Sequence, residues 1–222
     1  MEPAIDPKDV PIPEEIRKKW QNIVNILVKI LKVPVALVMK VEFPHFTVFQ
    51  SADSQGNPFK AGQDFMLPAG IYCEKTMEHK DKLLIPNALK DPAWSKNPSI
   101  EAGLISYLGF PVLYPNKRIF GTLCVLDNKE NTYSKDYEEI MLQFKEIIES
   151  HLELLWQKIM LEKLIEQQKV IEEQMKNKIE AIERFNKICV DRELRVVELK
   201  EKIVKLEDEL KQALRDVKRN IK

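Results

Sequence analysis

Glycine and proline are missing from the last part of the sequence, and their absence divides the chain in two. The last proline is Pro115 and the last glycine is Gly121, so all 13 prolines and all 6 glycines lie in residues 1–121. The turns of a compact domain need such residues, whereas a stretch without them can form one long helix. We therefore predict a folded N-terminal part and a helical C-terminal part.

Cysteines are few, and long apolar runs and an excess of one charge are absent. The three cysteines, Cys73, Cys124 and Cys189, have no CxxC spacing, which argues against a disulfide framework and against a metal site. No run reaches the ~18 apolar residues of a membrane-spanning helix, and residues 1–13 lack the apolar segment of a signal peptide. Lys plus Arg and Asp plus Glu each number 35, so the net charge of zero gives no sign of nucleic-acid binding. We expect a cytoplasmic protein with reduced thiols that binds neither a membrane nor nucleic acid.

The apolar pattern of the N-terminal part predicts an α+β domain. A helix begins after Pro13 and ends before Pro34. Its apolar stripe is formed by Ile16, Trp20, Ile23, Val24, Leu27 and Leu31. These positions recur at helical spacing, so one face of this helix is expected to cover a core.

Two strand pairs follow this helix. Alternating apolar residues predict one hairpin within residues 33–50 and a second within residues 105–127. A short helix over 71–79 and a short strand over 83–85 are predicted between them. Residues 118–127 are apolar on both faces, which predicts a central strand. Neighbouring strands flanked by helices indicate a central, mostly antiparallel sheet.

A last helix is predicted to begin after Ser134, which is a suitable N-cap. Its first part carries an apolar stripe for packing on the sheet, formed by Ile140, Phe144, Ile147, Ile148, Leu152 and Leu155. We accordingly divide the chain into a tail (residues 1–12), a globular domain (13–155) and a coiled-coil helix (156–222).

Apolar residues of the coiled-coil helix keep one heptad register from residue 161 onward. Because a lone helix would leave this stripe in water, we expect a second copy of the chain to cover it, most simply as a parallel homodimer. The apolar residues expected at the dimer seam are Leu161, Leu164, Ile171, Met175, Ile182, Phe185, Val196, Leu199, Ile203, Leu206, Leu210 and Val217. Gln168, Lys178 and Arg192 interrupt the seam, and they either fix the register or leave the coil soft enough to change its twist.

Several motifs of the globular domain belong to one pattern. They are Tyr72-Cys73, Asn87 with Asp91-Pro92-x-Trp94, Ser106-Tyr107-Leu108-Gly109-Phe110-Pro111 and Phe120-Gly121-Thr122-Leu123-Cys124-Val125-Leu126-Asp127. Together they resemble GAF domains of bacterial sensor kinases and cyclases. The resemblance implies a GAF-like fold with a small-molecule pocket between the sheet and residues 62–110. The candidate wall residues are Tyr72, Cys73, Met77, Trp94, Ile100, Tyr107 and Phe110. The alternative is that these side chains only fill the core.

A second resemblance lies in the coiled-coil helix. Residues 191–200 are similar to the "GRELRMVELK" segment that follows sensor domains in many bacterial signalling proteins, with Asp191 where glycine is common. This resemblance implies a sensor that passes its ligand state along the coil. We expect the output to be a separate histidine kinase of a two-component system, another partner protein, or domains outside this sequence. The sequence names neither the ligand nor a cofactor.

Two other functions stay open. One is a thiol-dependent reductase of the free methionine sulfoxide type that uses Cys73 or Cys124, although the cysteine spacing of that GAF branch is absent and free cysteines are commonly buried. The other is a ligand-free structural adaptor. The sequence has no Gly-rich phosphate loop, no Gly-x-Ser-x-Gly and no metal-ligand spacing. We therefore expect no catalytic residues and no enzyme activity.

Overall fold

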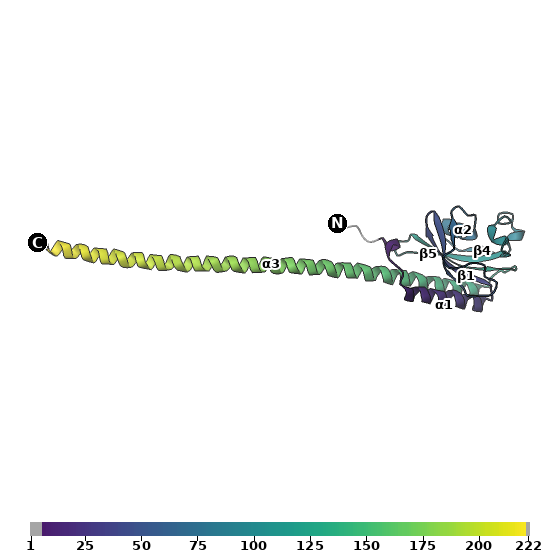
Figure 1. The fold of residues 1–222 in the computed structure, drawn as a ribbon, viewed down its shortest axis with the longest axis horizontal. Coiled ribbons are helices and arrows are strands. Elements are labelled where there is room, and N and C mark those ends of the chain that lie inside the picture. Colours follow the sequence, from purple (N-terminus) through teal and green to yellow (C-terminus); the bar gives the residue numbers. More distant parts are fainter. Residues whose placement is uncertain (1–5, 221–222) are drawn as a thin grey trace. The chain divides into compact units, whose positions relative to one another are not determined.

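The computed structural model describes the backbone of residues 6–220 and the side chains of residues 6–211. Val217, assigned above to the dimer seam, therefore lies outside the described side chains. The chain divides into two compact units after Leu161, and each is described by itself. The helices and strands (Figure 1) are α1 (Glu14–Leu31), β1 (Val35–Glu42), β2 (His45–Ser51), β3 (Asp64–Met66), α2 (Tyr72–His79), β4 (Leu83–Ile85), β5 (Ser106–Leu113), β6 (Ile119–Asp127) and α3 (Lys135–Asn220).

The strands form one six-stranded sheet in the order β3-β2-β1-β6-β5-β4, and every neighbouring pair is antiparallel. This confirms the predicted α+β domain with an antiparallel sheet. β6 pairs with β1 on one side and with β5 on the other, which is the central place that its two apolar faces predict. The edge strand β3 was not predicted, because its three residues are too few to show an alternating pattern.

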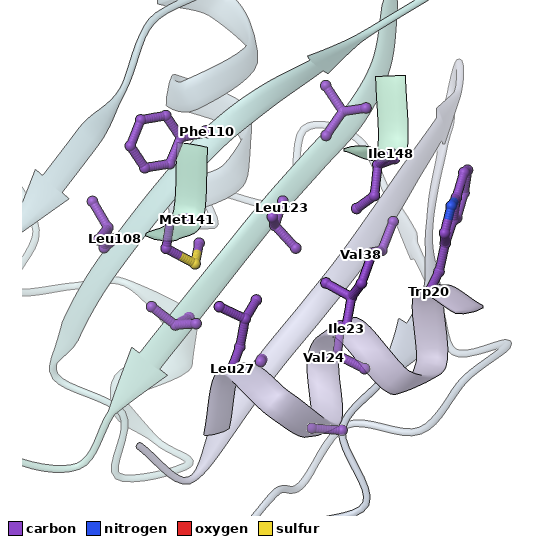
Figure 2. Packing of buried hydrophobic residues seen from close by; sticks show 14 of the residues in the cluster. Trp20, Ile23, Val24, Leu27, Val38, Leu108, Phe110, Leu123, Met141 and Ile148 are labelled. Carbon is purple, nitrogen blue, oxygen red and sulfur yellow. The ribbon is translucent and has the colours of Figure 1, made fainter. Parts of the chain in front are cut away.

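α1 and the first part of α3 pack on one face of the sheet (Figure 2). Trp20, Val24 and Leu27 of α1 are completely buried and point towards the strands. The Trp20 ring meets Phe120 of β6 edge-on, with ring centroids 5.5 Å apart, an arrangement that aromatic pairs favour. This apolar cluster holds both helices to the central strands.

The predicted packing stripe of α3 needs one correction. Ile148 and Leu152 are buried as expected, but 44 % of Ile147 is exposed. Met141 is completely buried instead, and it lies among the sheet residues in Figure 2. The buried positions 141, 148 and 152 follow helical spacing, and Ile147 points off this face.

The other face of the sheet carries α2 and the loops around it. Successive residues of a strand point to opposite faces, so Leu37 and Met39 of β1 belong to the cluster under α2 whereas Val38 belongs to the cluster under α1. In the hairpin predicted within residues 33–50, β1 stops at Glu42, and 83 % of the apolar residue Phe43 that follows it is exposed.

The second unit is the part of α3 that follows Leu161. The large apolar side chains described in it face solvent in the single chain; Leu164, Ile171 and Phe185, for example, are 60 %, 59 % and 65 % exposed. An apolar stripe of this kind lowers the free energy of the helix only when another surface covers it.

Candidate functional site

A cavity of about 100 Å³ lies between the sheet and α2. Leu37 and Met39 of β1 and Leu126 of β6 line it from the sheet side, and Tyr72 and Cys73 line it from α2. The remaining lining residues are Phe59, Phe65, Ile71, Pro98, Ser99 and Ala102. None of these described lining residues is charged, so the cavity suits a small, neutral and largely apolar ligand.

The structure brings most of the predicted wall residues together. Tyr72 and Cys73 line the cavity. Four others lie in the same apolar cluster without lining it: Met77, Trp94, Ile100 and Tyr107. The rings of Trp94 and Tyr107 lie 5.3 Å and 5.1 Å from the Tyr72 ring. Trp94 and Tyr107 therefore pack against Tyr72, which lines the cavity.

Phe110 has to be removed from the predicted wall. It lies in the cluster under α1 and α3, and Figure 2 shows its ring near Met141. Tyr107 and Phe110 are three residues apart on β5, an odd separation that places them on opposite faces of the sheet.

Two cysteines of the sequence motifs meet behind the cavity wall. Cys73 lies in the first turn of α2 and Cys124 in the middle of β6, and their Sγ atoms are 3.7 Å apart. Both thiols are free and buried. Cys73 also lines the cavity, whereas Cys124 is completely buried. The sulfur contact therefore joins the cavity wall to the central strand.

Hydroxyl groups surround this cysteine pair. The Tyr107 hydroxyl donates to Cys73 Sγ at 3.5 Å, and the Thr76 hydroxyl lies 2.9 Å from that of Tyr107. When Tyr107 donates to the sulfur, Thr76 donates to Tyr107. Thr122, two residues before Cys124 on the same face of β6, has a buried hydroxyl without a hydrogen bond of good geometry among the described residues. The Tyr107 hydroxyl can therefore stabilise a negative charge on the Cys73 sulfur.

Gly109 makes room for the Tyr107 side chain. It pairs with Cys124 across the strands β5 and β6. A Cβ atom on Gly109 would lie 2.0 Å from the Tyr107 Oη atom, far inside van der Waals contact. The glycine of the "SYLGFP" motif is therefore required for the phenol to reach the two sulfurs.

The two thiols differ in their acidity. The hydrogen bond with Cys124 lowers the pKa of Cys73 and outweighs burial, which raises it; the hydrogen bond from the Tyr107 hydroxyl lowers this pKa as well. The same hydrogen bond with Cys73 raises the pKa of Cys124, together with burial and the nearby charge on Cys73. Burial raises the pKa of Tyr107 well above its ordinary value, so its hydroxyl stays protonated and remains a donor. Cys73 is therefore the thiol that ionises first.

Sequence reasoning missed several lining residues. Phe59 and Phe65 come from the loop before β3 and from β3 itself, with ring centroids 6.3 Å apart. A large aromatic side chain such as Phe59 within a polar, Gly-rich segment was the available signal, because such a residue needs a buried contact. Ser99 supplies a hydroxyl to the lining.

The site offers no metal centre. Among the described residues, no group of three or more His, Cys, Asp and Glu side chains is arranged to hold a metal ion.

The Tyr72 hydroxyl stays protonated in the cavity wall. Burial raises the pKa of Tyr72 to about 12, and its hydroxyl lies 3.4 Å from the Leu104 carbonyl oxygen. What the geometry does provide is a small apolar cavity with the Cys73 thiol in its wall and the Cys124 thiol behind it.

Helices on one face of an antiparallel sheet and a small cavity on the other are the features of an α+β domain of the GAF class. The family profile described as the GAF domain matches residues 21–153. This match covers more than half of the chain, so the protein belongs to the GAF domain family.

Solved structures share this fold at low sequence identity. The GAF domain of an Acinetobacter phosphoenolpyruvate-protein phosphotransferase is 17 % identical with a TM-score of 0.51, covering 62 % of this chain and 81 % of that chain. The PixJ GAF domain of Thermosynechococcus elongatus, in its blue-light absorbing form, is 14 % identical with a TM-score of 0.53, covering 69 % and 92 %. A type II free methionine-R-sulfoxide reductase from Thermoplasma acidophilum is 13 % identical with a TM-score of 0.51, covering 64 % and 95 %. At these identities the likeness establishes the fold alone.

No curated protein matches the chain. Within the described residues, no helix combines the length and the apolar character that crossing a membrane requires.

Proposed function

We propose that this GAF domain protein is a dimeric sensor of a small, neutral molecule that passes its ligand state along α3 to a partner. The single observation that carries the proposal is the cavity of about 100 Å³ beside Tyr72 and Cys73. Pockets for drug-sized ligands begin at about 300 Å³, while a cavity of about 150 Å³ can hold one small ring. The cavity thus favours a ligand of a few heavy atoms, and an open cavity favours a sensor over a ligand-free adaptor.

The sheet offers a direct path from ligand to helix. Leu37 and Leu126 line the cavity from β1 and β6. On the opposite face of the same strands, Val38 and Leu123 lie in one cluster with Met141 of α3. A ligand that fits one arrangement of β1 and β6 better than another would bias how α3 is seated, and it can do so only by its difference in affinity for the two.

The dimer is supported by the pattern of exposed residues. Ile147 and Leu154 in the first unit are 44 % and 62 % exposed. Ile147 lies two heptads before Leu161 and Leu154 lies one heptad before it, so both occupy the same seam position as Leu161. The apolar stripe that needs a partner therefore begins on the helix segment of the GAF unit. A parallel pair would place the same residues of two chains opposite each other.

Native mass spectrometry of protein purified from its own host tests both parts of the proposal. The expected result is a dimer that retains a small molecule. A monomeric protein at micromolar concentration would refute the dimer, and an empty cavity under all growth conditions would favour the adaptor.

The orientation of the two helices is tested by disulfide crosslinking of an Ile203→Cys, Cys189→Ala variant. A parallel in-register pair crosslinks at position 203 and an antiparallel pair does not.

A methionine sulfoxide reductase activity is the second candidate. It is favoured by the Cys73–Cys124 pair, whose sulfurs lie 3.7 Å apart at the cavity wall. Incubation with free methionine-R-sulfoxide and a dithiol, with methionine measured by chromatography, decides it. Turnover that disappears in a Cys73→Ala variant would establish the enzyme, and the absence of turnover would leave the sensor.

A further inference from the structure

We propose that Cys73 and Cys124 form a reversible dithiol–disulfide site that reacts with a small hydroperoxide entering through the cavity. The two residues come from α2 and β6, 51 positions apart in the sequence, and the fold places their Sγ atoms 3.7 Å apart. A disulfide needs about 2.0 Å between the sulfurs, so a modest movement of Cys73 closes the bond. This site goes beyond the proposed sensor and requires neither its ligand nor its dimer.

The roles of the two cysteines follow from their access. Cys73 lines the cavity, and Ala102, which also lines it, is exposed to solvent. Cys124 is completely buried beneath the wall. An oxidant that enters the cavity therefore meets Cys73 first, and Cys124 is placed to resolve the product.

The surroundings of Cys73 favour the attacking thiolate. The Tyr107 hydroxyl donates to its sulfur, and Thr76 lies within hydrogen-bond distance of Tyr107. The hydrogen bond with the Cys124 thiol lowers the pKa of Cys73 and outweighs burial, which raises it.

The reaction balances with hydrogen peroxide as the oxidant. Cys73 first releases its proton. The thiolate then attacks one peroxide oxygen, an S–O bond forms, the O–O bond breaks, and the leaving hydroxide takes up the released proton and departs as water. The Cys124 sulfur then attacks the sulfenic acid of Cys73. An S–S bond forms, the S–O bond breaks, and the hydroxide leaves as water with the Cys124 proton. In total, the two thiols lose two electrons and become one disulfide, and one peroxide gains these electrons and becomes two waters. An external dithiol reduces the disulfide again.

The test uses the full chain carrying Cys189→Ala, which removes the exposed third thiol. The protein is reduced, freed of reductant and treated with stoichiometric hydrogen peroxide. Denatured thiol counting, intact mass and peptide mapping are the readouts. The expected result is loss of both thiols and of two hydrogen atoms, a Cys73–Cys124 linked peptide, and full reversal by dithiothreitol. Two thiols that still alkylate after denaturation, or added oxygen without a link, would overturn the proposal and leave both cysteines as core packing.

Matched variants separate chemistry from folding. Cys124→Ala should stop at a sulfenic acid on Cys73 that a dione reagent traps, and Cys73→Ala should leave Cys124 unreactive. Tyr107→Phe should slow oxidation by about tenfold or more, because it removes a hydrogen bond to a charged sulfur. Tyr133→Phe is the control, since Tyr133 is also buried but its hydroxyl lies 3.3 Å from the Ser106 hydroxyl, on the other face of the sheet. Equal rates for the two tyrosine variants would refute the role given to Tyr107.

Discussion

The indole Nε1–H of Trp20 donates a hydrogen bond to Nδ1 of His151 over 3.1 Å, joining α1 to α3. Nδ1 can accept this bond only while the imidazole is neutral. Burial lowers the pKa of His151, and the charge of Lys19 lowers it further. The contact between the two helices therefore depends on pH.

We expect the domain to lose stability as the pH falls below 6.5, the ordinary pKa of His151. The folded-state pKa is lower, so in this window the unfolded chain binds a proton that the folded chain does not. The stabilisation is complete above the unfolded pKa and is lost as the pH falls through the folded one. Thermal unfolding of wild type and of His151→Asn, from pH 8 downward, measures it. Parallel curves for the two proteins would contradict the assignment.

Val196 and Val197 provide a matched test of the dimer seam. Val196 occupies a seam position and Val197 the next, outward position, and they are 44 % and 53 % exposed in the single chain. Val196→Lys should raise the dimer dissociation constant by about tenfold or more, because it buries an unpaired ammonium group. Val197→Lys should leave it nearly unchanged. Analytical ultracentrifugation of both variants gives the constants, and equal effects would argue against the heptad register.

Gly109→Ala should lower the free energy of unfolding by about 1–3 kcal/mol, the usual range for overpacking. The added Cβ would lie 2.0 Å from Tyr107 Oη, so the phenol has to leave its place beside the sulfurs. Urea unfolding of Gly109→Ala, Tyr107→Ala and the double variant tests this cause. The double variant should cost less than the sum of the single ones; strict additivity would show that the two residues do not compete for space.

Ala102→Phe should block the cavity with little loss of stability. Ala102 is exposed and lines the cavity, so a phenyl ring can cover the opening without entering the packed core. Ala93→Phe is the control, because Ala93 is an exposed loop residue outside the lining. Any small molecule retained by wild type should be lost only from Ala102→Phe, as seen by native mass spectrometry. Retention by Ala102→Phe would point to a binding place other than this cavity.

Regular elements of the fold could be predicted because their pattern is local. The segment 118–127 shows both of its apolar faces in ten residues, and the structure places it in the middle of the sheet. The face of Phe110 could also have been predicted, since its odd separation from Tyr107 within one strand puts the two on opposite sides.

The site itself could be predicted only in part. Tyr72 and Cys73 carry a motif, but Phe59 and Ser99 enter the lining through loops whose course depends on tertiary contacts. The approach of Cys73 to Cys124 depends on where α2 docks on the sheet, and no local pattern encodes a distance across 51 residues. Neither the distance between the two sulfur atoms nor the volume of the cavity can be derived from the spacing of apolar residues in the sequence.

The sheet is a single layer of strands, so neighbouring residues of one strand face two different environments, and this limits which mutations β6 can accept. Leu123 and Cys124 are chain neighbours, yet one faces the helices and the other the thiol site. Insertion or deletion of one residue in β6 would exchange these two environments along the rest of the strand. We therefore expect related sequences to differ in β6 by substitutions, and to differ in length only in the loops.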